Sequence, residues 1–219
     1  MTEHLIYILI IIFLGGFLAI VLYLMTGILK ARKHKRSVLQ LFDVSETDIV
    51  FLGDSITEQC PWSELFQKTN IKNRGIGGDT TKGVLSRVES IIEGKPSKIF
   101  LCIGTNDNMF RIRPRKTIEN TQKIIQMIQE KSKNTKIYLE SLLPVRGLVA
   151  NLNTNGRIKK INNEIKNIAA ELGIPFIYLY DQFLDEKGRL DKKYSLDGLH
   201  LNGDGYLKWK GFIKKYVNE

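Results

Sequence analysis

The sequence predicts an α/β protein, a three-layer α/β/α sandwich with a mostly parallel sheet, preceded by one N-terminal transmembrane helix. Three observations predict it: an uncharged apolar run near the N-terminus, several short apolar runs typical of buried strands, and helical stripes between those runs. Strands that alternate with helices need crossover connections. Such connections give a parallel sheet with helices on both faces.

The apolar run covers residues 5–29, contains no charged residue and follows a short N-terminus, residues 1–4. At about 1.5 Å per residue the run reaches roughly 37 Å, enough to cross a hydrocarbon core of about 30 Å. A cleaved signal peptide would need a basic start, a shorter apolar core and a small-residue cleavage site. This N-terminus has no Lys or Arg, and the run ends in Lys30-Ala31-Arg32-Lys33. We therefore expect a transmembrane helix.

A basic connector, residues 30–47, follows the apolar run and leads into the domain that we assign to residues 48–219. Because the cations lie on the C-terminal side of the span, the positive-inside rule predicts a single-pass membrane protein with a cytoplasmic domain. The cations within seven positions are Lys30, Arg32, Lys33, Lys35 and Arg36.

The net charge of +10 is not by itself a nucleic-acid signal. After position 36 the chain has 28 basic and 22 acidic residues, a net charge of +6. This excess suits either a domain near an anionic lipid surface or a lysine-rich solvated exterior. No basic stripe interleaved with aromatic residues indicates nucleic-acid binding.

Within the domain, four short apolar runs are predicted to be buried strands. They are residues 49–52, 99–103, 137–139 and 176–179. Between them, apolar residues recur at helical spacing. The helical segments are Val84 to Ile92, Ile118 to Ile128 and Ile158 to Leu172. We expect Asp79-Thr80 to cap the first segment, and Gly173 and Pro175 to end the third.

Only one histidine lies in the predicted domain. His4 adjoins the apolar run and His34 belongs to the connector, so any imidazole base in the domain must be His200. The carboxylate of Asp197, three residues upstream, can reach back to one ring nitrogen and fix the tautomer. An isolated Asp-x-x-His pair is more often a surface pair than a catalytic one.

Ser55 follows the first predicted strand in the sequence Gly53-Asp54-Ser55. In a parallel sheet ligands bind beyond the carboxyl ends of the strands, and Gly53 permits a tight turn that exposes the serine hydroxyl. A simple helix cap is the alternative. The segment lacks the final glycine of the G-x-S-x-G elbow, which argues against an ordinary α/β-hydrolase.

Two further segments offer hydrogen-bond donors. Residues 73–81 form a glycine-rich turn in which the N–H of Gly78 could point at an anion, with a plain loop or a phosphate site as alternatives. The phosphate-loop pattern itself is missing. Asn106 follows the second predicted strand, and its side-chain amide is a donor at the same sheet edge, with an Asx turn as the alternative.

The sequence gives no basis for a disulfide framework or a metal centre. It contains two cysteines, and Cys102 lies within an apolar strand-like run where a buried thiol is expected. Three histidines without CxxC or HExxH spacing do not form a zinc site.

Taken in order, the motifs Gly53-Asp54-Ser55, Gly78, Gly104-x-Asn106-Asp107 and Asp197-x-x-His200 resemble the four blocks of the SGNH hydrolases, also called GDSL esterases. The likeness covers roughly Asp48 to Tyr206. The sequence NRGIGGDTT is most similar to the subgroup that contains the platelet-activating factor acetylhydrolase catalytic subunits. The transmembrane span is not part of the family pattern.

The resemblance implies a flavodoxin-like sheet and a catalytic triad with Ser55 as nucleophile, His200 as base and Asp197 as its orienter. It also implies an oxyanion hole formed by the backbone N–H groups of Ser55 and Gly78 and by the side-chain amide of Asn106. These are the groups that acyl transfer requires. No metal or organic cofactor is implied.

We therefore expect a membrane-anchored serine esterase that hydrolyses short-chain or O-acetyl esters through an acyl-enzyme on Ser55. An O-acyltransferase and a lysophospholipase or thioesterase that use the same site are alternatives, and a catalytically silent binding module is another. The anchor favours a lipid or glycan ester near the membrane as substrate. The sequence carries no signal for the acyl chain, the alcohol or the oligomeric state.

Overall fold

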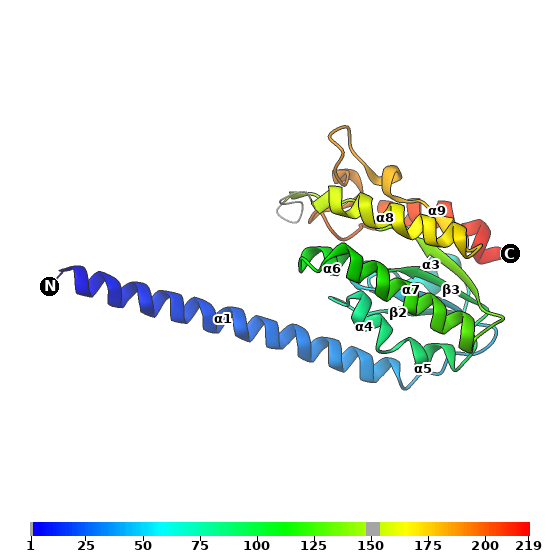
Figure 1. The fold of residues 1–219 in the computed structure, drawn as a ribbon, viewed down its shortest axis with the longest axis horizontal. Helices are drawn as coiled ribbons and strands as arrows, with labels where there is room; N and C mark the ends of the chain where they lie inside the picture. Colours follow the sequence, from blue (N-terminus) through cyan, green and yellow to red (C-terminus); the bar gives the residue numbers. More distant parts are fainter. Residues whose placement is uncertain (1, 148–153) are drawn as a thin grey trace. The chain divides into compact units, whose positions relative to one another are not determined.

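The computed structural model describes residues 2–147 and 154–219 and divides the chain into two compact units, Met1–Leu41 and Phe42–Glu219. The first unit contains the long helix α1 (Thr2–Leu39), drawn in blue in Figure 1. Its segment Ile6–Tyr23 has a mean hydropathy of 2.8 and is long and apolar enough to cross a membrane. A signal sequence would satisfy the same criterion. The helix continues through most of the basic connector, whose Lys and Arg residues favour helix.

The second unit is built on a five-stranded parallel sheet in the order β2-β1-β3-β4-β5. This is the flavodoxin-like order, and it confirms the predicted fold class. The strands are β1 (Ile49–Gly53), β2 (Ile71–Gly75), β3 (Lys98–Cys102), β4 (Lys136–Glu140) and β5 (Phe176–Ile177).

Helices cover both faces of the sheet (Figure 1). On one face α7 contacts α4, α5 and α8, whereas α3 and α9 lie on the other face. The helices are α2 (Ser55–Glu58), α3 (Trp62–Phe66), α4 (Thr81–Leu85), α5 (Val88–Ile92), α6 (Thr105–Met109), α7 (Pro114–Lys131), α8 (Thr154–Glu171) and α9 (Gly203–Asn218). Two short 3-10 helices, η2 (Tyr180–Phe183) and η3 (Lys192–Tyr194), precede α9.

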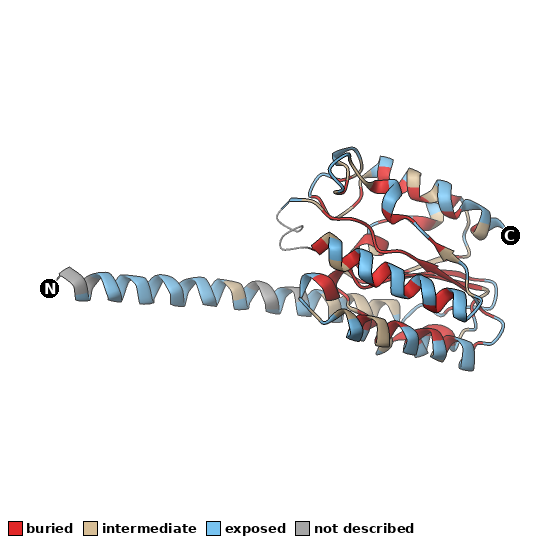
Figure 2. Cartoon of the chain, turned by 45° about the horizontal axis from the view of Figure 1, so that its top comes forward, coloured by how far each residue is buried: buried red, intermediate tan, exposed pale blue. Residues whose placement is uncertain are grey.

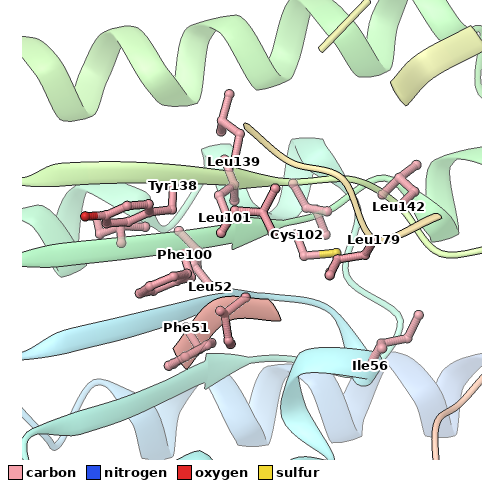
Figure 3. Close-up of a cluster of buried hydrophobic side chains, with 14 of the residues drawn as sticks. Phe51, Leu52, Ile56, Phe100, Leu101, Cys102, Tyr138, Leu139, Leu142 and Leu179 are labelled. Carbon is pink, nitrogen blue, oxygen red and sulfur yellow. The ribbon is translucent and has the colours of Figure 1, made fainter. Parts of the chain in front are cut away.

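An aromatic cluster holds α3 and α9 against the sheet. Phe51 stacks on Trp62 with ring centroids 4.1 Å apart and on Phe100 at 4.9 Å, and Trp62 meets Trp209 edge-on at 5.3 Å. Figure 3 shows Phe51, Phe100 and Tyr138 on neighbouring strands. The strands are largely buried, as the red ribbon in Figure 2 indicates. Because α9 follows His200 directly, this packing fixes where the imidazole lies.

One strand was not expected. Residues 73–81 were predicted to be a glycine-rich turn, but β2 includes Asn73 and pairs with β1 along its whole length. The polar sequence Ile-Lys-Asn-Arg-Gly has little apolar alternation because β2 is an edge strand, where polar residues are usual. The turn itself begins only after Gly75.

The predicted helix Val84 to Ile92 is two short helices, α4 and α5, with a break at Ser86-Arg87. The break turns Arg87 inward, where it donates to Asp79 at 2.9 Å and to the Gly53 carbonyl at 3.1 Å. At its N-terminus the expected cap is present, because the Thr80 side chain accepts from the N–H of Gly83.

Two predicted boundaries also differ. The strand predicted for residues 176–179, which is β5, ends at Ile177 instead of Leu179 because the chain turns into η2. Leu172, assigned to the core stripe of α8, is exposed since the helix ends at Glu171. The expected stop is present at Gly173, which has a φ of +64° that favours glycine.

Candidate active site

The ends of β1 and β3 bring two polar segments to one edge of the sheet. Gly53 pairs in register with Cys102, so Ser55 and Asn106 both follow the carboxyl ends of adjacent parallel strands. Glycine is needed at position 53 because an added Cβ would collide with the Thr57 side chain and the Cys102 carbonyl. This close approach lets α2 begin immediately after the strand.

Asp54 directly precedes Ser55 and caps the N-terminus of α2. Its carboxylate accepts from the N–H of Ile56 at 3.0 Å. Burial raises the pKa of Asp54 to about 7, and the neighbouring carboxylates of Asp79 and Asp107 add to the rise. The N–H of Ser55 has no acceptor among the residues that the structure describes and stays available at the start of the helix.

Three side chains form a continuous hydrogen-bonded chain. His200 Nε2 lies 2.9 Å from Ser55 Oγ, and His200 Nδ1 lies 2.6 Å from Asp197 Oδ2. A carboxylate can only accept, so Nδ1 carries the proton and Nε2 is left to accept from the serine hydroxyl. This arrangement can move a proton from Ser55 to His200.

The turn from Asp197 to His200 is held by its own backbone. Asp197 Oδ1 accepts from the N–H groups of Leu199 at 2.9 Å and His200 at 2.8 Å. Partial burial alone would raise the pKa of Asp197, but the hydrogen bonds from the His200 ring and the two backbone groups outweigh it and hold the pKa at about 2. Asp197 is therefore ionised at neutral pH.

Gly78 lies on a loop that is pinned to α2. Glu58 accepts from the N–H of Gly77 at 2.6 Å. The Asn73 amide donates to the carbonyls of residues 57, 58 and 60 at 2.9–3.0 Å. Gly78 has a φ of +72°, and its N–H has no acceptor in the described part of the chain. The loop thus presents a free donor beside the helix that starts at Ser55.

Asn106 is a buried amide whose position is fixed by one hydrogen bond. Its Nδ2 donates to the Asp79 carbonyl at 2.8 Å, and Asp79 is itself paired with Arg87. An amide nitrogen carries two hydrogens, so one N–H remains for another acceptor. The structure therefore places three N–H donors, from Ser55, Gly78 and Asn106, on the segments predicted to carry them.

Sequence reasoning missed two side chains that support this site. Ser195 Oγ accepts from the N–H of Gly198 at 2.9 Å and donates to Asp197 Oδ1 at 3.3 Å. The Tyr206 hydroxyl donates to the carbonyl of Ile56 at 2.7 Å. Ser195 was detectable as a short polar side chain two residues before Asp197, whereas the Tyr206 contact joins segments far apart in the sequence.

Residues 2–147 and 154–219 contain no group of three or more potential metal ligands. Both cysteines are buried and unpaired, as expected for Cys102.

Comparison with known proteins gives a consistent family assignment. Residues 51–208 match the sequence model of the GDSL-like lipase/acylhydrolase family. Platelet-activating factor acetylhydrolase IB subunit alpha2 from Homo sapiens is 31% identical over 80% of this chain and 78% of its own length. These matches confirm the resemblance inferred from the four motifs.

Solved structures agree with this assignment. A solved structure from Streptococcus pneumonia, whose description names a platelet activating factor, is 33% identical with a TM-score of 0.82. The match covers 90% of this chain and 97% of that chain. An acetylxylan esterase from Geobacillus stearothermophilus, Axe2, has a TM-score of 0.65 at 18% identity, covering 78% of this chain and 94% of its own, which shows a shared fold alone.

Proposed function

The chain belongs to the GDSL-like lipase/acylhydrolase family, and we propose that it is a membrane-anchored serine esterase that hydrolyses short-chain or O-acetyl esters through an acyl-enzyme on Ser55. The observation that carries the proposal is the chain of hydrogen bonds from Ser55 through His200 to Asp197. The N–H groups of Ser55 and Gly78, which have no acceptor within residues 2–147 and 154–219, lie on adjoining segments.

In the first half of the reaction, Ser55 Oγ attacks the ester carbonyl while its proton moves to His200 Nε2. Negative charge develops on the former carbonyl oxygen, where the N–H groups of Ser55, Gly78 and Asn106 stabilise it. The imidazolium then protonates the leaving alcohol as the carbon–oxygen bond breaks, which gives the acyl-enzyme. Asp197, ionised throughout, stabilises the imidazolium.

In the second half, water replaces the alcohol. His200 takes a proton from the water as its oxygen attacks the acyl carbon, and the same donors stabilise the second oxyanion. The proton returns to Ser55 Oγ when the carboxylic acid leaves. These steps use the ester, one water molecule and this chain's own residues.

The preference for short acyl groups draws on the relatives. The Homo sapiens relative is named for an acetylhydrolase activity, so its name gives an acetyl group as the acyl part of its substrate. The apolar α1 helix favours an ester at or near a membrane.

Replacement of Ser55 by Ala tests the proposal in the full-length chain. We expect turnover of p-nitrophenyl acetate and labelling by a fluorophosphonate probe to disappear. Ser86→Ala, at the end of α4, is the matched control and should keep both signals. Full turnover by Ser55→Ala, with an unchanged circular dichroism spectrum, would refute the assignment of the nucleophile.

Other uses of the same acyl-enzyme give different readouts. An O-acyltransferase would transfer the acyl group to added sugar or lipid alcohols faster than to water. A lysophospholipase or thioesterase would prefer long acyl chains or thioesters in a panel of graded substrates. A silent binding module would leave the fluorophosphonate probe unreacted.

The cations after the apolar segment favour a cytoplasmic catalytic unit. Because Cys60 and Cys102 are buried, a cysteine introduced at the exposed Lys187 can report the side of the membrane. In intact cells, a membrane-impermeant thiol reagent should leave Lys187→Cys unlabelled until the cells are opened. Labelling of intact cells would overturn the cytoplasmic orientation.

A further inference from the structure

An exposed turn joins α6, which carries Asn106, to α7. We call residues 109–113 the Phe110 turn. Phe110 is 61% exposed and Met109 is 38% exposed, so two adjacent apolar side chains face solvent. Exposed apolar residues scattered singly are ordinary, but this pair is followed at once by cations.

Hydrogen bonds to neighbouring segments and within the Phe110 turn hold its backbone in the conformation that leaves Phe110 exposed. The Arg157 guanidinium donates to the Ile112 carbonyl at 2.7 Å, and Arg111 has a φ of +56°, where glycine is the favoured residue. Three backbone bonds close the turn: Phe110 N–H to the Asn106 carbonyl at 2.8 Å, Arg111 N–H to Asn108 at 3.1 Å and Ile112 N–H to Asp107 at 2.9 Å.

Both cations of the turn lack an ion-pair partner in the described part of the chain. The guanidinium groups of Arg111 and Arg113 form no ion pair among the residues that the structure describes, and both residues are exposed. The next cations, Arg115 and Lys116, instead lie 2.8 Å and 3.6 Å from the carboxylate of Glu119. The turn thus combines an exposed aromatic ring with two available guanidinium groups.

This combination is complementary to an anionic phospholipid surface. Guanidinium groups bind phosphate oxygens in pairs, and an exposed aromatic ring gains free energy by entering the headgroup boundary. We propose that the Phe110 turn docks the catalytic unit on an anionic phospholipid bilayer, with Phe110 in the interface and Arg111 and Arg113 on headgroup phosphates. The Phe110 N–H donates to the Asn106 carbonyl, so docking brings the end of α6, the helix that carries Asn106, to the lipid surface.

The proposal deepens the proposed function, because it rests on the membrane anchor and selects esters carried in the bilayer as substrates.

A fluorescent label can report docking in the full-length chain. We place bimane at Met109→Cys in nanodiscs that contain nitroxide-labelled lipid, with either phosphatidylglycerol or phosphatidylcholine. The native cysteines are buried and leave the introduced thiol as the reactive one. Bimane at Asn134→Cys, exposed before the amino end of β4, is the matched position away from the turn.

We expect lipid quenching at position 109 in phosphatidylglycerol discs, weaker quenching in phosphatidylcholine and little at position 134. Arg111→Gly removes a charge while it suits the positive φ, so it should lower the docked-to-undocked ratio about fivefold without unfolding the chain. Arg113→Gln should lower the docked-to-undocked ratio by a similar factor. Arg115→Gln should lower this ratio less, because the Arg115 guanidinium is already paired with Glu119.

Equal quenching at positions 109 and 134, or quenching that Arg111→Gly and Arg113→Gln leave unchanged, would overturn the docking proposal. A change in bimane emission at position 109 that depends on protein concentration in lipid-free detergent would also overturn it, because it would identify a second copy of the chain as the occupant. Turnover of water-soluble p-nitrophenyl acetate should be unchanged in these variants. Loss of Ser55-dependent turnover with docking intact would instead refute the esterase proposal alone.

Discussion

Tyr206 donates its hydroxyl to the carbonyl of Ile56 at 2.7 Å, which joins the helix that follows His200 to the helix that begins at Ser55. Asn202 caps the first of these helices by accepting from the N–H of Gly205 at 3.0 Å. The Tyr206 hydroxyl therefore links the segments that carry Ser55 and His200, which lie far apart in the sequence. Stacking and edge contacts with Trp209 and Trp62 hold the phenol itself.

Tyr206→Phe should reduce activity more than stability. The ring still packs, so we expect a stability loss of about 1 kcal/mol from the missing hydrogen bond. A looser distance between Ser55 and His200 should lower kcat by about tenfold or more, with KM little changed. Tyr138→Phe, which removes a hydroxyl bonded to Glu219 at the other end of the sheet, is the control. Equal kcat values in the two variants would contradict this role of Tyr206.

Ser195→Ala should make the position of the Asp197 carboxylate less well fixed. Its hydroxyl both accepts from Gly198 and donates to Asp197, and its side chain is buried. Without it the Gly198 N–H loses its acceptor and the pKa of Asp197 should rise from about 2. We expect kcat to fall about tenfold and Ser195→Thr to restore most of it, measured with p-nitrophenyl acetate across a pH series. Full activity in Ser195→Ala would show that the backbone alone orients Asp197.

Asn106→Ala should act on the transition state. Loss of one oxyanion donor typically costs about 100- to 1,000-fold in kcat with little effect on KM. Asn106 also donates to the Asp79 carbonyl, so Asn106→Ala removes a structural hydrogen bond as well. A control variant must separate that structural effect from the loss of the oxyanion donor. Asn120→Ala removes another buried amide, bonded to Thr81 at 2.9 Å, and should lose stability but keep activity. If Asn120→Ala were equally inactive, the Asn106 effect would be structural.

The local parts of the candidate site were predictable because each motif is contiguous. Asp197 reaches His200 within one turn of chain, and Ser55 follows a strongly apolar strand. The order of the motifs and the sheet topology then place them at one edge. Alternating strands and helices predicted a mostly parallel sheet, and the resemblance to the SGNH hydrolases implied its flavodoxin-like order.

The parts that escaped prediction depend on contacts distant in sequence. Edge strand β2 is recognisable only from its pairing with β1, because its own residues are mostly polar. The break between α4 and α5 exists because Arg87 turns toward the Gly53 carbonyl, which local helical periodicity does not report. Tyr206 shows no local pattern that distinguishes it from an ordinary core tyrosine.

A buried carboxyl outside the proposed triad makes stability depend on pH. Glu140, at the end of β4, is 3% exposed and accepts from the Trp209 indole N–H at 2.6 Å. Burial raises the pKa of Glu140 from 4.5 to about 8, although the indole hydrogen bond lowers it slightly. Between these two values the folded state holds a proton that the unfolded state has released. The free energy of unfolding therefore falls as pH rises from about 4.5 to about 8.

Glu140→Gln should remove the part of this dependence that Glu140 contributes, while Asp54, whose pKa burial raises to about 7, keeps its own contribution. The neutral amide oxygen still accepts from Trp209, and no charge has to be buried at high pH. We expect the variant to be more stable than the native chain at pH near 8, by an amount on the order of a few kcal/mol, and similar to it near pH 4. Urea unfolding of the full-length chain, followed by Trp fluorescence at a series of pH values, measures the difference. Glu186→Gln, on an exposed loop, should leave the native pH profile unchanged. Parallel pH profiles for Glu140→Gln and the native chain would mean that Glu140 is already ionised in the folded state.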